Sequence, residues 1–503
     1  TLEDLGLGLA NDGALYGKSI ALLAGHGYYR HESLGWTTQR DLIYGIIEDD
    51  WNALVNNQYV IPYLARAGLR VYNSRETDMQ SREIIVKQVE TSGEGLSRWT
   101  AELPEAGLYG VSLRFPAKLN AEGDLVFRVG TPAGIREVRF PRKTAWAGWH
   151  YLGMFAFAQG RQAFVEYAGV ATGGAVPDPG SVSVDAVVGD PTAGVPDAVR
   201  WGGGMGSIAR GGRVSGQPRW REATPYFMDF LGCPKDLCYP AVSNEFWRDQ
   251  YAKPLFVNLV KADVMLSIHA NASGKMTEEF PEATKDLARY ANNNREAYGA
   301  MRGTESYIRN RPTEAEVRYH RSVHEHLIAA IRRMYDPAWK DRGRMNADFV
   351  VIKNTLASIP SVLPEMAFFD NVDDSRAMRD PNFMRACARG VYEGIAAFLA
   401  PGAPFLPVPP SRLRVEAGTK DGDPTAEGEP SAAPRVIWDL DQAFPVDRVK
   451  LYASPDGTFF DGGRYVPKEG CLLSELPVGT RAVYAAAVNV GGESWPSGAI
   501  VLP

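Results

Sequence analysis

Continuous apolar runs flank a stretch with helical spacing in the opening part of the chain. Residues 19–24, Ser-Ile-Ala-Leu-Leu-Ala, predict a buried strand. Apolar residues then recur at helical spacing over about 47–67, which predicts a helix that Pro62 should bend and Gly68 should end. A second apolar run at 69–72 predicts another strand. The order strand, helix, strand is typical of an α/β sheet.

The pattern changes between about 86 and 195. Helical spacing disappears there, and short alternating runs such as 109–115 and 124–129 lie between glycine, proline and asparagine turns. This pattern predicts a β-sandwich. Because α/β character returns after the glycine-rich segment 201–206, we expect the sandwich to be inserted into an α/β domain.

The second α/β part, 196–402, mixes short apolar runs with long helical patterns. We expect strands at 263–268, 349–352 and 361–365, and helices at about 314–335 and 383–399. The expected fold class is therefore an α/β domain, with a mostly parallel twisted sheet flanked by helices, that carries an inserted β-sandwich.

The tail of the chain opens with many prolines. Segment 401–410 predicts an extended, semi-rigid linker, which we place at 403–412. Beyond it, 413–503 alternates as a second β-sandwich would, and the acidic stretch 413–434 is expected to be partly mobile. The expected parts are thus 1–85 and 196–402 for the α/β domain, 86–195 for the insertion, 403–412 for the linker and 413–503 for the C-terminal β domain.

Composition narrows the class of protein. At 503 residues the chain exceeds a single hydrophobic core, and 45% hydrophobic with 23% charged residues is typical of a folded protein. A net charge of −6 without a basic run argues against nucleic acid as a partner. We expect no membrane span, because no apolar run approaches about 20 residues. The start at Thr1 fits either a cytosolic protein or one whose signal peptide has been removed.

Four cysteines occur, and two of them lie close together in sequence. Cys233 and Cys238 could form one disulfide in an oxidising compartment or stay reduced, and the sequence leaves both states open. Their spacing is too wide for a CxxC redox pair. Without a second pair, a structural zinc ribbon is not expected.

Two histidines follow apolar strands. His26 lies between glycines just after 19–24, and His269 ends the run 263–268. Ligands of α/β sheets collect at the carboxyl ends of strands, so both imidazoles can reach one edge and share a metal ion. The alternative for each is a loop histidine with no such role.

Two glutamates complete a candidate site. Glu48 opens the helix at 47–67, where a carboxylate can also simply stabilise the helix dipole. Two histidines and one carboxylate are, however, the ligand set of a catalytic zinc with an open position. Glu365 ends the run 361–365 and could act as a general base, although a salt-bridged strand end is the alternative.

In this order the motifs resemble the zinc-dependent N-acetylmuramoyl-L-alanine amidases, which cleave bacterial peptidoglycan. The resemblance implies zinc bound by His26, Glu48 and His269, with Glu365 as the catalytic carboxylate. Six segments carry it: 48–53, 69–75 with Asp78, 267–271, 303–307, 341–343, and 361–368 with Asn371.

The chain departs from the family pattern around its first histidine. Tyr28 stands where the family usually has glycine, and the interval from His26 to Glu48 is longer than usual and contains His31, which could compete as a ligand. A further insertion is expected at 274–302. Candidate substrate contacts are Asn271, Tyr28, Arg75 and Asn371.

The two β segments resemble known modules. Through its segments 99–109, 148–153 and 184–187 the inserted one is similar to the golvesin C-terminal domain, and 413–503 looks like fibronectin type III. Exposed aromatic residues of such a module could stack on sugar rings, but we favour Trp146 and Trp149 as core residues. The C-terminal module is expected to space or dock the enzyme.

The expected function is therefore zinc-dependent hydrolysis of the amide between N-acetylmuramic acid and L-alanine of peptidoglycan. That substrate implies export to the periplasm or the cell exterior. Two alternatives stay open: an amidohydrolase acting on another glycopeptide amide, and a catalytically silent polysaccharide-binding protein.

Overall fold

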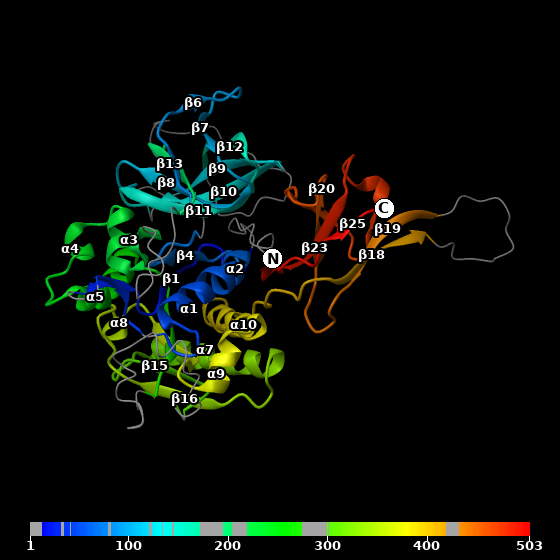
Figure 1. Cartoon of the computed structure of the whole chain (residues 1–503). Helices are drawn as coiled ribbons and strands as arrows, with labels where there is room; N and C mark the ends of the chain where they lie inside the picture. The colour runs from blue at the N-terminus through cyan, green and yellow to red at the C-terminus, as the bar shows by residue number, and fades with distance from the viewer. Residues whose placement is uncertain are drawn as a thin grey trace.

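A computed structural model describes most of the chain, in three bodies: an α/β domain, a β-sandwich above it and a C-terminal β domain beside both (Figure 1). The described residues are 13–31, 35–40, 42–78, 82–119, 123–132, 134–142, 145–171, 195–203, 219–273, 299, 301–418 and 432–503. Most of the expected insertion at 274–302, part of the glycine-rich segment and most of the acidic stretch after 413 lie outside them.

One six-stranded sheet organises the α/β domain. Its order is β16 (Asp341–Asn346), β15 (Thr304–Ile308), β17 (Ser361–Phe368), β14 (Val264–Asn271), β1 (Ser19–Ala24) and β4 (Arg70–Asn73). All neighbouring strands are parallel except β15 and β17, which are antiparallel. Because β1 and β4 precede the sandwich and β14 follows it, the expected mostly parallel sheet with an inserted domain is confirmed.

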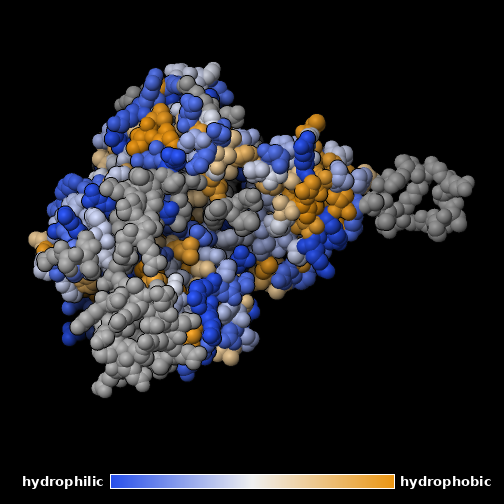
Figure 2. Space-filling model, in the orientation of Figure 1, coloured by the Kyte–Doolittle hydropathy of each residue, from blue (hydrophilic) through white to orange (hydrophobic). Residues whose placement is uncertain are grey.

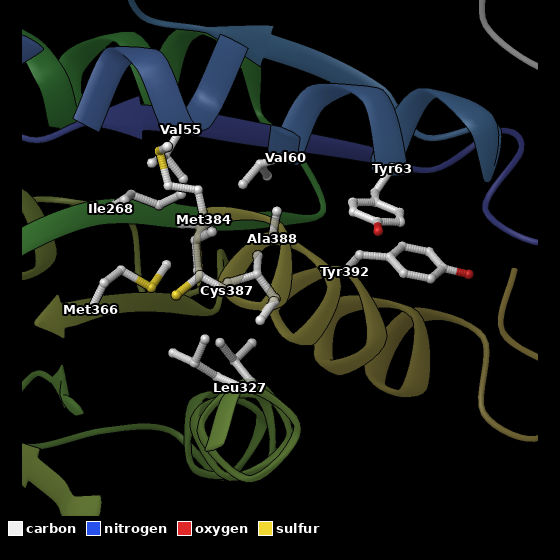
Figure 3. Packing of buried hydrophobic residues seen from close by; sticks show 14 of the residues in the cluster. Val55, Val60, Tyr63, Ile268, Leu327, Met366, Met384, Cys387, Ala388 and Tyr392 are labelled. Atoms are coloured by element: carbon white, nitrogen blue, oxygen red, sulfur yellow. The ribbon is translucent and has the colours of Figure 1, made fainter. Parts of the chain in front are cut away.

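Alternate residues of the central strands point to opposite faces of this sheet, so each face buries its own cluster. Ile20 and Leu22 pack on one face and Ala21 and Leu23 on the other. The first face is covered by α1 (Glu48–Val55), α2 (Ile61–Arg66), α7 (Glu314–Met334) and α10 (Pro381–Leu399), as Figure 3 shows from close by. The second is covered by α3 (Thr224–Phe230), α5 (Glu245–Val260) and α8 (Val350–Lys353).

The helix expected at 47–67 is interrupted before Pro62. Between α1 and α2 the chain makes a π-helical turn, Asn56–Val60, and Pro62 lies in the first turn of α2. Proline has no N–H to donate, and its ring crowds the carbonyl four residues earlier, which explains the wider turn at this point. The bend expected from Pro62 therefore takes the form of a π turn.

The strand expected at 349–352 is wrong. Val350–Lys353 form the short helix α8 instead. Val351 and Ile352 are buried against α5, so a run too short to show periodicity satisfies its apolar side chains as one helical turn. The segment at 341–343, which resembles a turn, begins strand β16 at the edge of the sheet.

The inserted domain consists of two antiparallel sheets that share one core. One sheet contains strands from both ends of the insertion, β5 (Ile84–Val86) and β13 (Ala198–Trp201), so it extends beyond the expected range 86–195 on both sides. The order in this sheet is β11 (Gly148–Phe157), β8 (Gly107–Phe115), β13 and β5. The order in the other sheet is β10 (Gly134–Pro141), β9 (Asp124–Thr131), β12 (Gly160–Ala171), β7 (Ser97–Leu103) and β6 (Glu90–Thr91).

Trp146 and Trp149 lie between the sandwich and the helices of the α/β domain. Trp149 is buried in the cluster that contains Leu23, and its backbone N–H donates to the carbonyl of Leu231 at 2.8 Å. The indole of Trp146 donates to the same carbonyl at 3.2 Å. A Cβ at Gly148 would lie 1.9 Å from that oxygen, so only glycine allows this approach. These tryptophans join two domains and do not form an exposed sugar-binding face.

The C-terminal domain has two sheets around a small core that includes Val436, Leu451 and Val483. The strands are β18 (Ser411–Gly418), β19 (Ala432–Asp439) and β22 (Cys471–Leu472) in one sheet, and β21 (Arg464–Val466), β20 (Arg448–Ser454), β23 (Ala482–Asn489), β24 (Gly492–Glu493) and β25 (Ile500–Val501) in the other. The likeness to fibronectin type III stays a prediction.

The proline-rich linker is extended but anchored. Leu406 is fully buried in the core beside α10, and its backbone N–H and carbonyl bond to Tyr392 and Arg389, both at 2.8 Å. The C-terminal domain also docks directly, because Trp495 packs on Tyr63 with ring centroids 5.3 Å apart. The linker therefore fixes this domain and does not hold it away as a spacer.

Cys233 and Cys238 are buried free thiols, and the Cys238 S–H donates to the Cys233 carbonyl at 3.4 Å. None of the helices in the described part of the chain combines the length and apolar composition that a membrane crossing requires. On the face shown in Figure 2, hydrophilic residues dominate the described surface, and apolar residues gather in separate patches on the sandwich and on the C-terminal domain.

Candidate metal centre

His26 lies in a sharp backbone turn at the end of β1. Its φ of 60° is in the left-handed region, which non-glycine residues rarely adopt, and Gly27 follows at φ 154°. The backbone N–H of Gly25 still donates to Ile268 of β14 at 2.7 Å, so the turn starts as strand pairing stops. Such strain is often found where a side chain must be aimed at a site.

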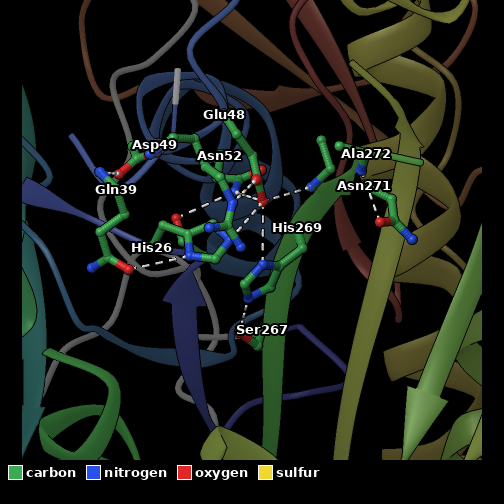
Figure 4. A network of polar contacts seen from close by, with 12 residues as sticks. His26, Gln39, Glu48, Asp49, Asn52, Ser267, His269, Asn271 and Ala272 are labelled. Atoms are coloured by element: carbon green, nitrogen blue, oxygen red, sulfur yellow. Dashed lines mark hydrogen bonds and ion pairs between the residues drawn. The ribbon is translucent and has the colours of Figure 1, made fainter. Parts of the chain in front are cut away.

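His26, Glu48 and His269 converge on one point at this edge of the sheet (Figure 4). Glu48 Oε1 lies 3.3 Å from His26 Nε2 and 3.3 Å from His269 Nδ1. The three candidate ligand atoms all lie within 4.8 Å of one another, and all three residues are buried. Among the described residues, this is the group of His, Cys, Asp and Glu side chains that could hold a metal ion.

Gly25 makes room for the second imidazole. A Cβ at this position would lie 2.4 Å from the ring of His269. Because no rearrangement of a flexible side chain could relieve that overlap, any other residue at 25 would push His269 away from Glu48. The glycine before His26 is therefore required by packing inside the site, beyond its effect on backbone freedom.

Gln39 fixes the proton on His26. Its Nε2 donates to the Asp249 carboxylate at 2.7 Å, so its Oε1 is the atom that faces His26 Nδ1 at 3.3 Å. An amide oxygen can only accept, which places a hydrogen on Nδ1, and Nε2 is the nitrogen that faces Glu48. His269 has a comparable outer contact, because its Nε2 lies 3.2 Å from Ser267 Oγ.

The charges at the site favour a cation. Burial raises the pKa of Glu48, but His26 and His269 outweigh that effect and hold it well below its usual value, so the carboxylate is ionised. Burial lowers the pKa of His269 to about 4, which keeps this imidazole neutral at pH 7 with a lone pair available. Glu48 Oε1 also accepts from Asn52 and from the backbone of Ala270, both at 3.2 Å, which fixes its orientation.

Glu365 lies on the neighbouring strand β17, directly opposite His269 in the strand register. It is buried, and its Oε2 has no hydrogen-bond partner among the described residues. Burial raises its pKa well above the usual value, and the carboxylates of Glu48 and Glu305 raise it further. A buried carboxyl group with an unused oxygen beside a candidate metal site is a candidate proton carrier.

Glu305, opposite Glu365 on β15, has the reverse environment. It accepts from Asn271 and Tyr307, both at 2.7 Å, and from Arg342 at 2.6 Å. The two adjacent buried glutamates thus differ in their hydrogen bonding. Glu305 accepts from three donors, whereas Glu365 Oε2 has no donor among the described residues. Glu305 belongs to the segment 303–307 that resembles the amidases, but the sequence alone did not assign it a role.

The remaining candidate residues have contacts of their own. Tyr28 has no exposed surface, and its hydroxyl donates to Asp50 at 2.6 Å. Arg75 is buried and donates to the carbonyl of Asp49 at 2.7 Å. Asn371 caps α9 (Val372–Met378) with its Oδ1. In this arrangement these three support the site or its neighbouring helices, and Asn271, which is partly exposed, remains the candidate substrate contact of the four.

The long interval between His26 and Glu48 forms a hairpin of β2 (Tyr28–His31) and β3 (Gly35–Thr38). Asp49, which sequence reasoning missed, holds its base by accepting from the backbone N–H groups of Gly27 and Gln39 at 3.0 and 2.9 Å. His31 lies on the hairpin and does not belong to the group of ligand atoms around Glu48. In this arrangement His31 does not stand as an alternative to His26 in that group.

Comparisons with known proteins agree with these features. Residues 243–397 match the family model for N-acetylmuramoyl-L-alanine amidase, and residues 73–187 match that for the Golvesin C-terminal domain. The endolysin of Bacillus phage SPP1 is 28% identical over 144 residues, 28% of this chain and 42% of that protein. The N-acetylmuramoyl-L-alanine amidase CwlM of Bacillus licheniformis is 27% identical over 135 residues, 27% of this chain and 40% of that protein. The chain thus spans about two fifths of these curated relatives.

Two solved structures are similar to part of the chain. The catalytic domain of CwlV, an N-acetylmuramoyl-L-alanine amidase from Bacillus (Paenibacillus) polymyxa var. colistinus, is 24% identical, with a TM-score of 0.22 over 30% of this chain and 68% of that one. An N-acetylmuramoyl-L-alanine amidase from Clostridium difficile 630 is 19% identical, with a TM-score of 0.23 over 31% and 69%. Residues 243–397 thus match the N-acetylmuramoyl-L-alanine amidase family and residues 73–187 the Golvesin C-terminal domain, and the sheet that unites β1, β4 and β14 shows that the second region interrupts an α/β domain after β4.

Proposed function

We propose that this chain is a zinc-dependent amidase that hydrolyses the bond between N-acetylmuramic acid and L-alanine in peptidoglycan. The observation that carries the proposal is the meeting of His26, Glu48 and His269 at the strand edge where Glu365 has an unused oxygen. The family match supplies the substrate class. Because peptidoglycan lies outside the cytoplasmic membrane, the proposed place of action is the periplasm or the cell exterior.

The distance from Glu48 to each histidine fits zinc. Two atoms each about 2.1 Å from one tetrahedral ion lie about 3.4 Å apart. Glu48 Oε1 is 3.3 Å from each histidine nitrogen, which agrees with that spacing. Two imidazoles and one carboxylate are also the ligands that leave a catalytic zinc one open position.

Zinc bound there would polarise the substrate carbonyl and lower the pKa of water to about 7. Hydrogen bonds with Gln39, Asn52 and Ser267 orient the side chains of His26, Glu48 and His269 respectively. Glu365 Oε2 accepts a proton from the attacking water and delivers it to the nitrogen of the departing alanine. Its burial keeps bulk water from taking over that transfer.

Glu365→Gln tests the role of the carboxyl group. The variant keeps the shape of the side chain but cannot carry the proton, so turnover on purified sacculi is expected to fall about 10²–10⁴-fold with zinc content unchanged. Activity is measured by mass spectrometry of released stem peptides with a free L-alanine amino group, and zinc by elemental analysis. Glu416→Gln, at an exposed strand of the C-terminal domain, serves as control.

His269→Ala tests the metal site separately. Loss of stoichiometric zinc together with activity supports the ligand set, whereas full zinc binding in this variant contradicts it. A native chain that binds zinc but releases no stem peptide would favour a catalytically silent polysaccharide-binding protein. Release of a different product would favour another amide as substrate, a possibility raised by the hairpin beside His26.

A further inference from the structure

A row of aromatic side chains runs from the hairpin at the metal centre onto α5. His31 and Tyr29 of β2 have ring centroids 5.9 Å apart, and Tyr29 lies 6.0 Å from Phe246 at the start of α5. Phe246 lies 5.3 Å from Trp247, and Trp247 lies 6.4 Å from Tyr251. These five residues are called the aromatic row below.

The outer end of the aromatic row is open to solvent. Trp247 is 41% and Tyr251 37% exposed, and a spacing of four residues places both on one side of α5. Phe246 meets Trp247 edge to face, with an angle of 86° between the ring planes. The exposed part of the Trp247 indole is open to a stacking ligand.

The inner end of the aromatic row is tied to the metal centre. Tyr29 follows His26 by three residues, and Gln250, next to Tyr251, donates to Gln39 Oε1 at 2.7 Å. The same Gln39 oxygen lies 3.3 Å from His26 Nδ1. One long polymer could therefore lie on the aromatic row and at the same time place its scissile bond at the metal centre.

The charged groups of α5 are paired with one another, which favours contact with an uncharged face of a ligand. Glu245 is paired with Arg248, and Asp249 with Lys253, so these four ionic groups satisfy one another. The surface thus offers aromatic faces together with a phenol and an indole N–H. That combination suits a pyranose ring, which has apolar C–H faces and hydroxyl groups around its edge.

We propose that the aromatic row is a subsite for the glycan strand of peptidoglycan, whose sugar rings stack along α5 while a muramoyl amide lies at the metal centre. The proposal rests on the proposed function and adds a specificity element to it. The hairpin and α5 would then select polymeric substrate over isolated muramoyl peptides, since only a strand reaches both places.

The test uses the full chain and glycan strands freed of all stem peptides by an unrelated amidase. Because such strands contain no bond to cleave, binding is measured apart from catalysis, for example by titration calorimetry. Trp247→Ala and Tyr251→Ala are each expected to weaken binding about three- to tenfold, and Trp247→Tyr to retain most of it. Phe349→Ala removes an equally exposed aromatic outside the row and is expected to bind as the native chain does.

Zinc content and thermal unfolding of each variant show whether it is folded. Unchanged binding by folded Trp247→Ala and Tyr251→Ala overturns the proposal. If the native chain binds the strands through these residues yet releases no stem peptides from sacculi, the proposed amidase activity fails while the glycan subsite stands.

Discussion

Three residues that are not candidate ligands position the side chains of the metal centre. Gln39 orients His26, Asp49 holds the loop that carries both, and Gly25 leaves space for His269. None of the three is a candidate ligand. Their effects reach the ligands only through contacts between distant segments, so a scan for ligand residue types does not detect them.

Gln39→Leu should reduce zinc affinity without unfolding the chain. The substitution removes the acceptor that holds the proton on His26 Nδ1, and such outer partners are worth about 10–100-fold in metal affinity. Competition with a chelator of known affinity measures the change. Gln250→Leu also loses a bond to Gln39 but leaves His26 untouched, so its affinity should fall less. Equal affinities in native chain and Gln39→Leu would remove this role.

A second histidine cluster lies under α7, away from the metal centre. Ser306 Oγ lies 2.7 Å from His320 Nε2 and 2.8 Å from His324 Nδ1, while His324 Nε2 lies 3.0 Å from Asp341. The Asp341 carboxylate can only accept, so His324 carries its hydrogen on Nε2 and accepts from Ser306 on Nδ1. Ser306 then accepts from His320. The His324 imidazole keeps both bonds only while it is neutral, because protonation would put a hydrogen on the nitrogen that accepts from Ser306.

This cluster predicts a loss of stability in mild acid. Burial, followed by the effect of His324, lowers the pKa of His320 to about 4, against about 6.5 in the unfolded chain. Between these values the unfolded state binds the extra proton, so the free energy of unfolding decreases as pH falls from about 6.5 to 4, by up to about 3 kcal/mol. Denaturant unfolding across this range should show a smaller slope in His320→Gln. An identical slope in both proteins would contradict the assignment.

At the scale of elements, α7 and α10 pack closely against each other. A Cβ added at Gly390 would lie 2.6 Å from the Leu327 Cα, and one at Gly394 would lie 2.5 Å from the Val323 Cα. Backbone therefore contacts backbone, and the two glycines of α10 set the separation of the helices. Both helices also carry part of the core of the sheet face shown in Figure 3.

Gly394→Ala should destabilise the α/β domain although alanine favours helices. The gain in helix propensity, about 1 kcal/mol, is outweighed when α7 must move, for a net loss of about 1–2 kcal/mol in the free energy of unfolding. Gly93→Ala is the control, since a Cβ there meets no atom within 4 Å. A higher melting temperature for Gly394→Ala would show that the helices have room to separate.

Elements with long periodic patterns follow the sequence closely, while short ones do not. The helix expected at 314–335 is α7, which Thr313 and Glu316 start with a reciprocal capping box. The apolar run at 349–352 is four residues long and forms a helix because α5 covers it. A short apolar run fits either structure locally, and packing decides between them.

At the scale of the whole molecule, the α/β domain serves as the platform for both β domains. The sandwich rests on the sheet face of Leu23 through Trp149, and the C-terminal domain rests on α2 and α10. Arg66 of α2 and Glu493 form an ion pair at 3.1 Å, with side chains only 9% and 16% exposed. The three bodies are thus joined by buried contacts as well as by the chain.

Arg66→Met should loosen the C-terminal domain. Glu493 would keep a buried charge without its closest cation, at a cost of about 2–3 kcal/mol. The expected results are a lower first unfolding temperature and faster proteolysis within 403–410. Adding Glu493→Gln should restore part of the lost stability, because it removes the buried carboxylate charge that Arg66 no longer neutralises. Arg412→Met, whose exposed pair with Asp439 lies on the far side of the linker, should behave as the native chain.

The sequence by itself determined the α/β class, the insertion, and which residue types end the central strands. These depend on periodicity and on strand ends, which are local properties that a chain carries in its order of residues. It also led, through six ordered motifs, to a family whose model matches 243–397.

Only the tertiary structure decided which of those groups meet. It brought Glu48 to the two histidines, left His31 on a hairpin, buried Tyr28 and Arg75, and turned Trp149 toward the helices. Protons, charges and close glycine contacts in the site depend on atoms that lie far apart in the chain. Their energies are set by distance and burial, which exist only once the chain has folded.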